Sequence, residues 1–216
     1  RDEFHNRPTA PLQAWPAPVG FVLAGKDLQS GGSWLGLGSQ GEFALLTNVR
    51  NAALNLPATA PSRGELVLNT IENGQGPTEE TALKYAGFNL IHGNLKSMEL
   101  SCTSNQGLKL RNGLSFSVSL EPGIYSVSNG HLGAPWPKTR LLETGLRYQL
   151  ECLNDSNTDR LHVEKSLLGL LGHTGLADDT ELPNTGVPHE WEKMLSAVKI
   201  VSPLYGTRSS AVILMN

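Results

Sequence analysis

The order of strand-like and helix-like segments constrains this chain more than any other feature of its sequence. Apolar runs bounded by Gly, Pro and Asn indicate strands, and apolar residues three and four positions apart indicate helices. The expected segments form five blocks: strands at Val19–Ala24, Trp34–Gly38 and Phe43–Thr47; helices at Arg63–Asn73 and from Thr78; strands at Met98–Cys102, Leu108–Arg111, Ser115–Leu120 and Ile124–Ser128; helices at Leu141–Leu153, Glu164–Leu171 and Trp191–Val198; a strand at Ala211–Met215. This order predicts an α+β fold of two stacked antiparallel sheets covered by helices on both outer faces.

Two segments have the composition of loops. The stretch Arg1–Pro18 contains four prolines and resists regular structure, so an ordered loop is expected there. The stretch Asp178–Pro188 is expected to be a second loop and not a linker between domains. With 216 residues and no break in composition, the sequence predicts one domain spanning residues 1–216.

The charge and cysteine content exclude several classes of function. Lys and Arg number 17 against 20 Asp and Glu, and the basic residues are scattered, which argues against a nucleic-acid partner. The only cysteines, Cys102 and Cys152, lack the spacing of a structural zinc site and are expected to be buried, reduced thiols. Reduced thiols and the lack of an apolar run of about 20 residues predict a cytoplasmic protein.

Three glycines spell a pattern known from nucleotide-binding folds. Gly36, Gly38 and Gly41 form GxGxxG, which binds a dinucleotide only where a strand is followed by a helix. Here the following residues, Phe43–Thr47, favour a strand. The glycines are therefore expected to shape a β-hairpin, and no nucleotide cofactor is expected.

Polar side chains follow apolar strands in three segments: 45–50, 125–130 and 205–210. Strand ends are where a rigid scaffold presents amides and guanidinium groups to a ligand. An asparagine in such a place can instead cap a turn, and charged residues in a loop such as Arg1–Thr9 are commonly solvated. Both interpretations stay open from these residues alone.

Many short segments, taken in order, resemble one family. They are Arg1-Asp2-Glu3-Phe4 with Arg7-Pro8, Ala24–Asp27, Gly31–Gly36, Thr47–Arg50, Ser62–Gly64, Phe88–Leu90, Ser128–Gly130, Leu182–Pro188 and Tyr205–Arg208. Together they are similar to the signature segments of the NRDE family, a transport and Golgi organisation family. The resemblance covers nearly the whole chain.

This resemblance implies the four-layer αββα sandwich of N-terminal-nucleophile hydrolases. Family members carry about 20 further residues upstream, with a cysteine that resembles the nucleophile of cysteine amidohydrolases. That segment, which would contain the first strand, is not in this sequence. Arg1 cannot replace the cysteine because its guanidinium stays protonated, so no amide hydrolysis is expected of the chain as given.

The resemblance also assigns roles to residues. For a hydrolase, Asp2, Asn129 and Arg208 would be catalytic: Arg1 and Asp2 would orient the nucleophile, Asn48 and Asn129 would stabilise the oxyanion, and Arg208 would complete the polar floor. The residues expected to bind a ligand are Arg1, Asp2, Glu3, His5, Arg7, Asn48, Arg50, Arg63, Asn129, His131 and Arg208. No metal site is assigned.

For function, the resemblance implies a carrier of haem or another amphipathic molecule. Arginine suits haem propionates or CoA phosphates, and His5 and His131 are the candidate axial ligands of a haem cargo. Transient contact with a membrane or an acceptor protein is expected, and the oligomeric state is left open. The alternatives are an acyl-CoA or lipid-binding protein and, at full length, a cysteine amidohydrolase.

Overall fold

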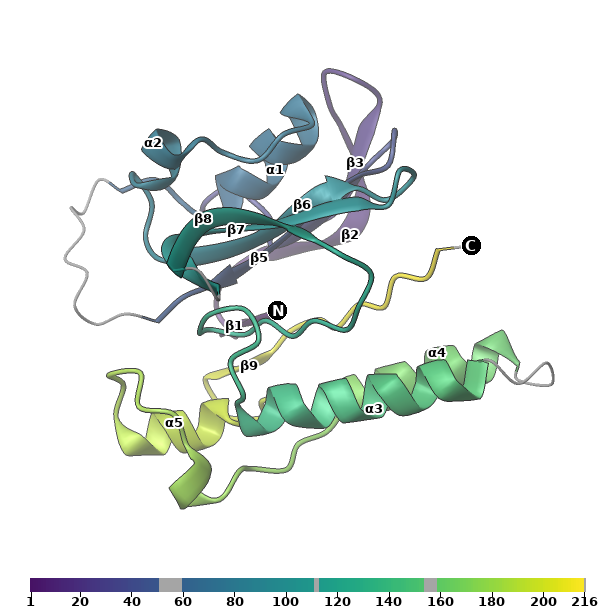
Figure 1. The fold of residues 1–216 in the computed structure, drawn as a ribbon. Coiled ribbons are helices and arrows are strands. Elements are labelled where there is room, and N and C mark those ends of the chain that lie inside the picture. Colours follow the sequence, from purple (N-terminus) through teal and green to yellow (C-terminus); the bar gives the residue numbers. More distant parts are fainter. Residues whose placement is uncertain (51–59, 111–112, 154–158, 216) are drawn as a thin grey trace. The chain divides into compact units, whose positions relative to one another are not determined.

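The computed structural model describes residues 1–50, 60–110, 113–153 and 159–215 (Figure 1). Its strands are β1 (Asp2–Phe4), β2 (Thr9–Pro16), β3 (Phe21–Asp27), β4 (Leu35–Gly38), β5 (Glu42–Asn48), β6 (Phe88–Asn94), β7 (Glu99–Leu110), β8 (Gly113–Leu120) and β9 (Tyr205–Thr207). Its helices are α1 (Gly64–Asn73), α2 (Glu79–Ala82), α3 (Pro137–Leu153), α4 (Arg160–Leu171) and α5 (His189–Leu195), with a short 3-10 helix η1 (Asp179–Glu181).

The described residues form two compact units. Unit 1 contains residues 1–6, 124–126 and 133–216, and unit 2 contains residues 7–123 and 127–132. Each unit holds one antiparallel sheet, of two strands in unit 1 and seven in unit 2. The expected α+β class with two antiparallel sheets and helices is therefore confirmed. The four-layer stacking, the likeness to N-terminal-nucleophile hydrolases and the single domain stay predictions.

The sheet of unit 2 runs in the order β2-β3-β4-β5-β6-β7-β8, so each strand pairs with its neighbour in sequence. The hairpin expected around the glycine pattern is present: β4 pairs with β5, and Gly41 takes φ +96° in the turn. A strand follows this turn, as expected for hairpin glycines.

One side of this sheet, which we call the helix face, is closed by α1. The helix buries Leu66, Val67, Thr70 and Ile71, the residues whose spacing predicted an apolar helical face. The helix face consists of Val22, Ala24, Ala44, Phe88 and Leu90, all buried. Both α1 and α2 lie on this side of the sheet (Figure 1).

The opposite side of the same sheet is also apolar, and we call it the leucine face. Directly paired residues project to one side of an antiparallel sheet, and the register places Leu35 beside Leu45 and Ile91 beside Cys102. The leucine face consists of Leu23, Leu35, Leu37, Phe43, Leu45, Ile91, Leu100 and Cys102. Apart from buried Cys102, these side chains are half-buried.

Unit 1 is built around the pairing of β1 with β9, in which Asp2 lies opposite Thr207 and Phe4 opposite Tyr205. Phe4, Trp191 and Tyr205 pack edge-on or tilted, with ring centroids 5.1–6.3 Å apart. A small core of Leu195, Ala197 and Ile200 lies beside Tyr205. The three helices expected in this part of the sequence are confirmed as α3, α4 and α5.

The expectations for the opening segment and two strands were wrong. The stretch Arg1–Pro18 contains two strands, β1 and β2, and β2 covers most of the residues after β1. The strand β2 tolerates Pro11 and Pro16 because it is the edge strand of its sheet. The stretch Ile124–Ser128 contains no strand. Residues Ala211–Met215 contain none either, although their apolar run suggested one.

Three further differences concern segments that were merged, missed or misjudged. The strands expected at Met98–Cys102 and Leu108–Arg111 are one continuous strand, β7. The strand β6 was not anticipated. Cys102 is buried as expected, but Cys152 is only half-buried, and both are free cysteines.

Candidate functional site

Three residues that the family resemblance selected meet in unit 2, at the end of β5. The Asn129 side chain donates from Nδ2 to the Asn48 carbonyl over 2.9 Å, and its Oδ1 accepts from the Arg50 guanidinium over 2.9 Å. The Arg50 backbone nitrogen also donates to the Asn129 carbonyl, at 2.9 Å. These bonds hold the loop of residues 127–132 against the strand end.

Asn89 attaches the same loop from the next strand. Its Nδ2 donates to the Gly130 carbonyl at 2.7 Å and to Thr47 Oγ1 at 3.2 Å. Asn89 lies opposite Thr47 on one side and Ser104 on the other, so the three polar side chains continue the leucine face at one end. We call the group Thr47, Arg50, Asn89, Ser104 and Asn129 the polar end.

Asn89 was quoted in a family segment but was not assigned to the site. Its signal in the sequence is a polar residue between Phe88 and Leu90, two core residues that are fully buried. A buried asparagine must place its amide in hydrogen bonds, so such a residue marks a polar contact inside an apolar layer.

Arg63 lies at the start of α1 and binds the backbone near the polar end. Its guanidinium donates to the Gly87 carbonyl at 2.9 Å, and the Val49 amide donates to the same oxygen at 2.8 Å. Burial lowers the pKa of the Arg63 guanidinium. Its neighbour Gly64 packs against the Gly32 backbone, because a Cβ added at Gly32 would lie 2.3 Å from a Gly64 backbone atom. The family segments 31–36 and 62–64 are therefore in contact.

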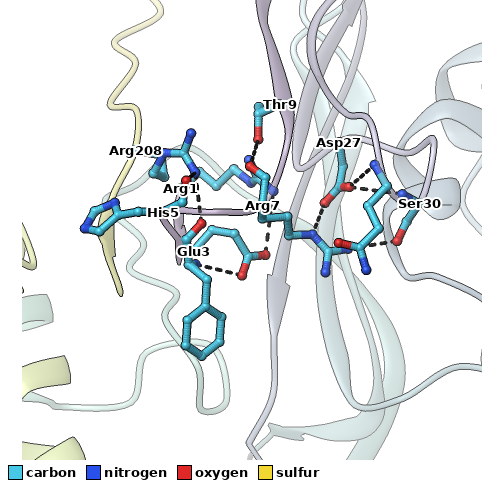
Figure 2. A network of polar contacts seen from close by, with 10 residues as sticks. Arg1, Glu3, His5, Arg7, Thr9, Asp27, Ser30 and Arg208 are labelled. Atoms are coloured by element: carbon cyan, nitrogen blue, oxygen red, sulfur yellow. Dashed lines mark hydrogen bonds and ion pairs between the residues drawn. The ribbon is translucent and has the colours of Figure 1, made fainter. Parts of the chain in front are cut away.

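Arg7, also in unit 2, belongs to a separate ion pair (Figure 2). Its Nε donates to Asp27 at 2.7 Å, and its terminal nitrogen donates to Ser30 Oγ at 2.8 Å. Partial burial raises the pKa of Asp27, but hydrogen bonds from Arg7 and from the Ser30 and Gln29 amides outweigh it, so the pKa lies below its usual value. These contacts stabilise the turn after β3.

Apart from His131, the remaining candidates lie in unit 1, around the β1–β9 pair. Asp2 accepts from Thr207 Oγ1 at 2.5 Å. The Arg208 guanidinium donates to the Phe4 and His5 carbonyls at 2.9 and 3.2 Å, and Figure 2 shows Arg208 beside His5. Arg1 lies 3.6 Å from the Glu3 carboxylate. Asp2 and Arg208 therefore both stabilise the strand pair.

The two candidate histidines differ in what their rings contact. His5, in unit 1, is exposed, and its Nε2 donates to the Ser202 carbonyl at 2.9 Å. His131, in unit 2, follows Gly130 in the loop at the polar end, and its Nδ1 is buried without a hydrogen-bond partner in the part of the chain that the structure describes. Of the two rings, that of His131 has the nitrogen for which a partner is missing.

Neither thiol chemistry nor metal binding is prominent among the described residues. Burial raises the pKa of the Cys102 thiol to about 11, which leaves it protonated near neutral pH and a poor nucleophile. In the described ranges, no three His, Cys, Asp or Glu side chains gather closely enough to hold a metal ion. No helix in those ranges is long and apolar enough to cross a membrane.

Comparison with known proteins extends the family resemblance to the whole chain. A family model described as Transport and Golgi organisation 2 matches residues 1–216. The Transport and Golgi organization protein 2 homologs of Bos taurus and Homo sapiens are each 31% identical to this chain, and the Mus musculus homolog is 27% identical. Each alignment covers 100% of this chain and 80% of the relative. The chain therefore belongs to the Transport and Golgi organisation 2 family, as the ordered NRDE segments indicated.

Proposed function

We propose that this protein binds a hydrophobic, anionic small molecule in unit 2 and carries it, with haem as the first candidate. The apolar body of the ligand would lie on the leucine face, and its anionic group would meet the polar end. The observation that carries the proposal is that the leucine face continues into the polar end. The pair Leu45 and Ile91 lies next to the pair Thr47 and Asn89 on the same two strands.

The charge of the polar end supports an anionic group. Arg50 is its only ionisable member, and a guanidinium keeps its positive charge at every physiological pH. Asn129 uses one Nδ2 hydrogen on the Asn48 carbonyl, and an amide nitrogen carries two. A carboxylate or phosphate beside Arg50 would therefore meet a positive charge and would not face an opposing acid within this group.

The position of His131 supports haem over a ligand that is only an alkyl chain. Imidazole is a common axial ligand of haem iron, and His131 lies in the loop at the polar end, directly after Gly130, whose carbonyl accepts from Asn89. The relatives are named for transport and Golgi organisation, which supports a carrier. Acyl-CoA or lipid binding is the alternative, because half-buried leucines also suit an alkyl chain.

Titration with haem tests the proposal. Wild-type protein should shift the Soret band in a saturable manner, and His131→Ala should change the spectrum and weaken binding because the iron loses its ligand. His162→Ala, which alters an exposed histidine of α4, is the matched control and should behave like wild type. An unchanged Soret band in wild-type protein, together with no displacement by palmitoyl-CoA of a fluorescent fatty acid, would overturn the proposal.

Two further variants separate the parts of the site. Arg50→Met should weaken haem binding about 10-fold, since it removes one charge while the Arg50 backbone bond to Asn129 stays. Arg160→Met removes an exposed arginine of α4 and is its control. If palmitoyl-CoA binds, haem does not, and Arg50→Met weakens palmitoyl-CoA, then the cargo is an acyl-CoA or lipid and not haem.

A further inference from the structure

The amide of Asn89 is oriented unambiguously by its partners. The Gly130 carbonyl can only accept, so the Asn89 atom 2.7 Å away must be the Nδ2 nitrogen. The second Nδ2 hydrogen serves Thr47 Oγ1. Both donors of the side chain are therefore used, and Asn89 has only its Oδ1 oxygen to offer.

That oxygen has no hydrogen-bond partner among the described residues, although the Asn89 side chain is 1% exposed. A buried acceptor without a donor is destabilising, and native proteins rarely leave one unmet. Nδ1 of His131, one residue beyond the carbonyl that Asn89 binds, also lacks a partner among the described residues, but this nitrogen donates or accepts according to the tautomer. The Asn89 oxygen is the acceptor that is short of a hydrogen-bond donor.

The Asn89 side chain and the positively charged Arg50 guanidinium bind adjacent residues of the same loop. Asn89 binds the carbonyl of Gly130, and Arg50 binds both the carbonyl and the side chain of the preceding residue, Asn129. The neighbouring loop residues Asn129 and Gly130 are therefore bound by the Arg50 guanidinium and by the Asn89 side chain, whose oxygen is an unmet acceptor. A ligand that contacted both would need a proton donor and an anion close together in its headgroup.

We infer that the ligand headgroup carries an N–H or O–H donor beside its anionic group, and that this donor binds Oδ1 of Asn89. The inference rests on the proposed function, because it specifies the headgroup at the same polar end. The simplest amphiphiles of this class are N-acyl amino acids, in which an alkyl chain, an amide N–H and a carboxylate follow one another.

One pair of probes isolates the donor. N-dodecanoylglycine and N-dodecanoylsarcosine have the same chain and the same charge, but the sarcosine compound carries a methyl group in place of the amide hydrogen. Isothermal titration below the micellar concentration should show about 10-fold tighter binding of the glycine compound to wild-type protein. This comparison needs no variant, so it does not depend on whether a substitution at Asn89 folds.

A variant then assigns the preference to its residue. Asn89→Leu has a similar size and no acceptor, so the 10-fold ratio should fall to about 1. Asn73→Leu replaces an exposed asparagine at the end of α1 and should keep the wild-type ratio.

The outcomes separate this inference from the proposed function. Equal binding of both probes to wild-type protein would overturn the inference, since a water would then satisfy Asn89, and would leave ligand binding standing. Haem binding without binding of either probe would also overturn it. If haem, palmitoyl-CoA and both probes all fail to bind, the proposed function fails as well.

Discussion

The helix face and the leucine face are two sides of the same strands, yet they are buried to different degrees. Leu90 on the helix face is fully buried under α1, whereas Leu45 on the leucine face is half-buried. The helix face ends in core residues such as Phe88, but the leucine face ends in the polar group around Asn89. The difference teaches that one side of the sheet mainly stabilises the fold, while the other side can change with less effect on stability.

The largest expected effect compares leucines on the two faces. Leu90→Ala should lower the free energy of unfolding by about 2–5 kcal/mol, because it leaves a cavity under α1. Leu45→Ala should lower it by only about 1 kcal/mol, because its side chain is half-buried. Urea unfolding of both variants checks this, and equal losses would remove the distinction between the faces.

The reactivity of the two cysteines tests how deeply Cys102, on the leucine face, is buried. At a pKa of about 11 instead of 9.0, the thiolate share of Cys102 near pH 8 is about 100-fold lower than that of an ordinary thiol. Iodoacetamide should therefore modify half-buried Cys152 long before Cys102, as peptide mass spectrometry would show. Fast labelling of Cys102 in the folded protein would show that this side chain is less deeply buried than described.

Substitution of a glycine tests how tightly α1 packs on the helix face. A Cβ added at Gly36 would lie 2.6 Å from Ile71 Cδ1 and 3.3 Å from Val22 Cγ1, so Gly36→Ala should destabilise the protein by about 1 kcal/mol. Gly169→Ala in α4 meets nothing within 4 Å and should instead stabilise by about 0.5–1 kcal/mol. Thermal unfolding measures both, and a neutral Gly36→Ala would mean that α1 packs more loosely than described.

The smallest effect concerns His92, which donates or accepts a 2.9 Å bond with Thr103 on the helix side of the sheet. Burial lowers the pKa of His92 below its usual 6.5, so the unfolded chain binds its proton more readily than the folded chain does. Stability from this residue is present above pH 6.5 and is lost as the pH falls toward the folded pKa. His92→Gln should flatten that part of the urea-midpoint profile, and exposed His162→Gln should not.

Local patterns predicted the helices well and the sheet only in part. The face of α1 and the cap at Thr78, whose side chain accepts from the Thr81 amide, follow from residues a few positions apart. The strand β6 was missed because Asn89 and His92 interrupt its apolar run. The pairing of β9 with β1 was missed because it joins distant segments and because β9 has only three residues, too few to show a strand pattern. The apolar run 211–215, by contrast, forms no strand.

The candidate site was predictable only as far as ordered family segments could select it. The meeting of Asn48, Arg50 and Asn129 agrees with the expectation that strand ends gather polar groups. No sequence pattern indicates that Asn89 donates one amide hydrogen to the loop and the other to Thr47 while its oxygen stays unmet, because that depends on three-dimensional partners. The roles of all these residues in binding stay predictions until ligands are tested.

The β1–β9 ladder has a consequence for synthesis of the protein on the ribosome. The bond between Asp2 and Thr207 spans 205 positions in the sequence. At about 5–20 residues per second, β1 must wait roughly 10–40 s before its partner strand is made. During that interval Phe4 and its neighbours are an unpaired strand edge, which a chaperone or a nascent copy of the same chain could occupy.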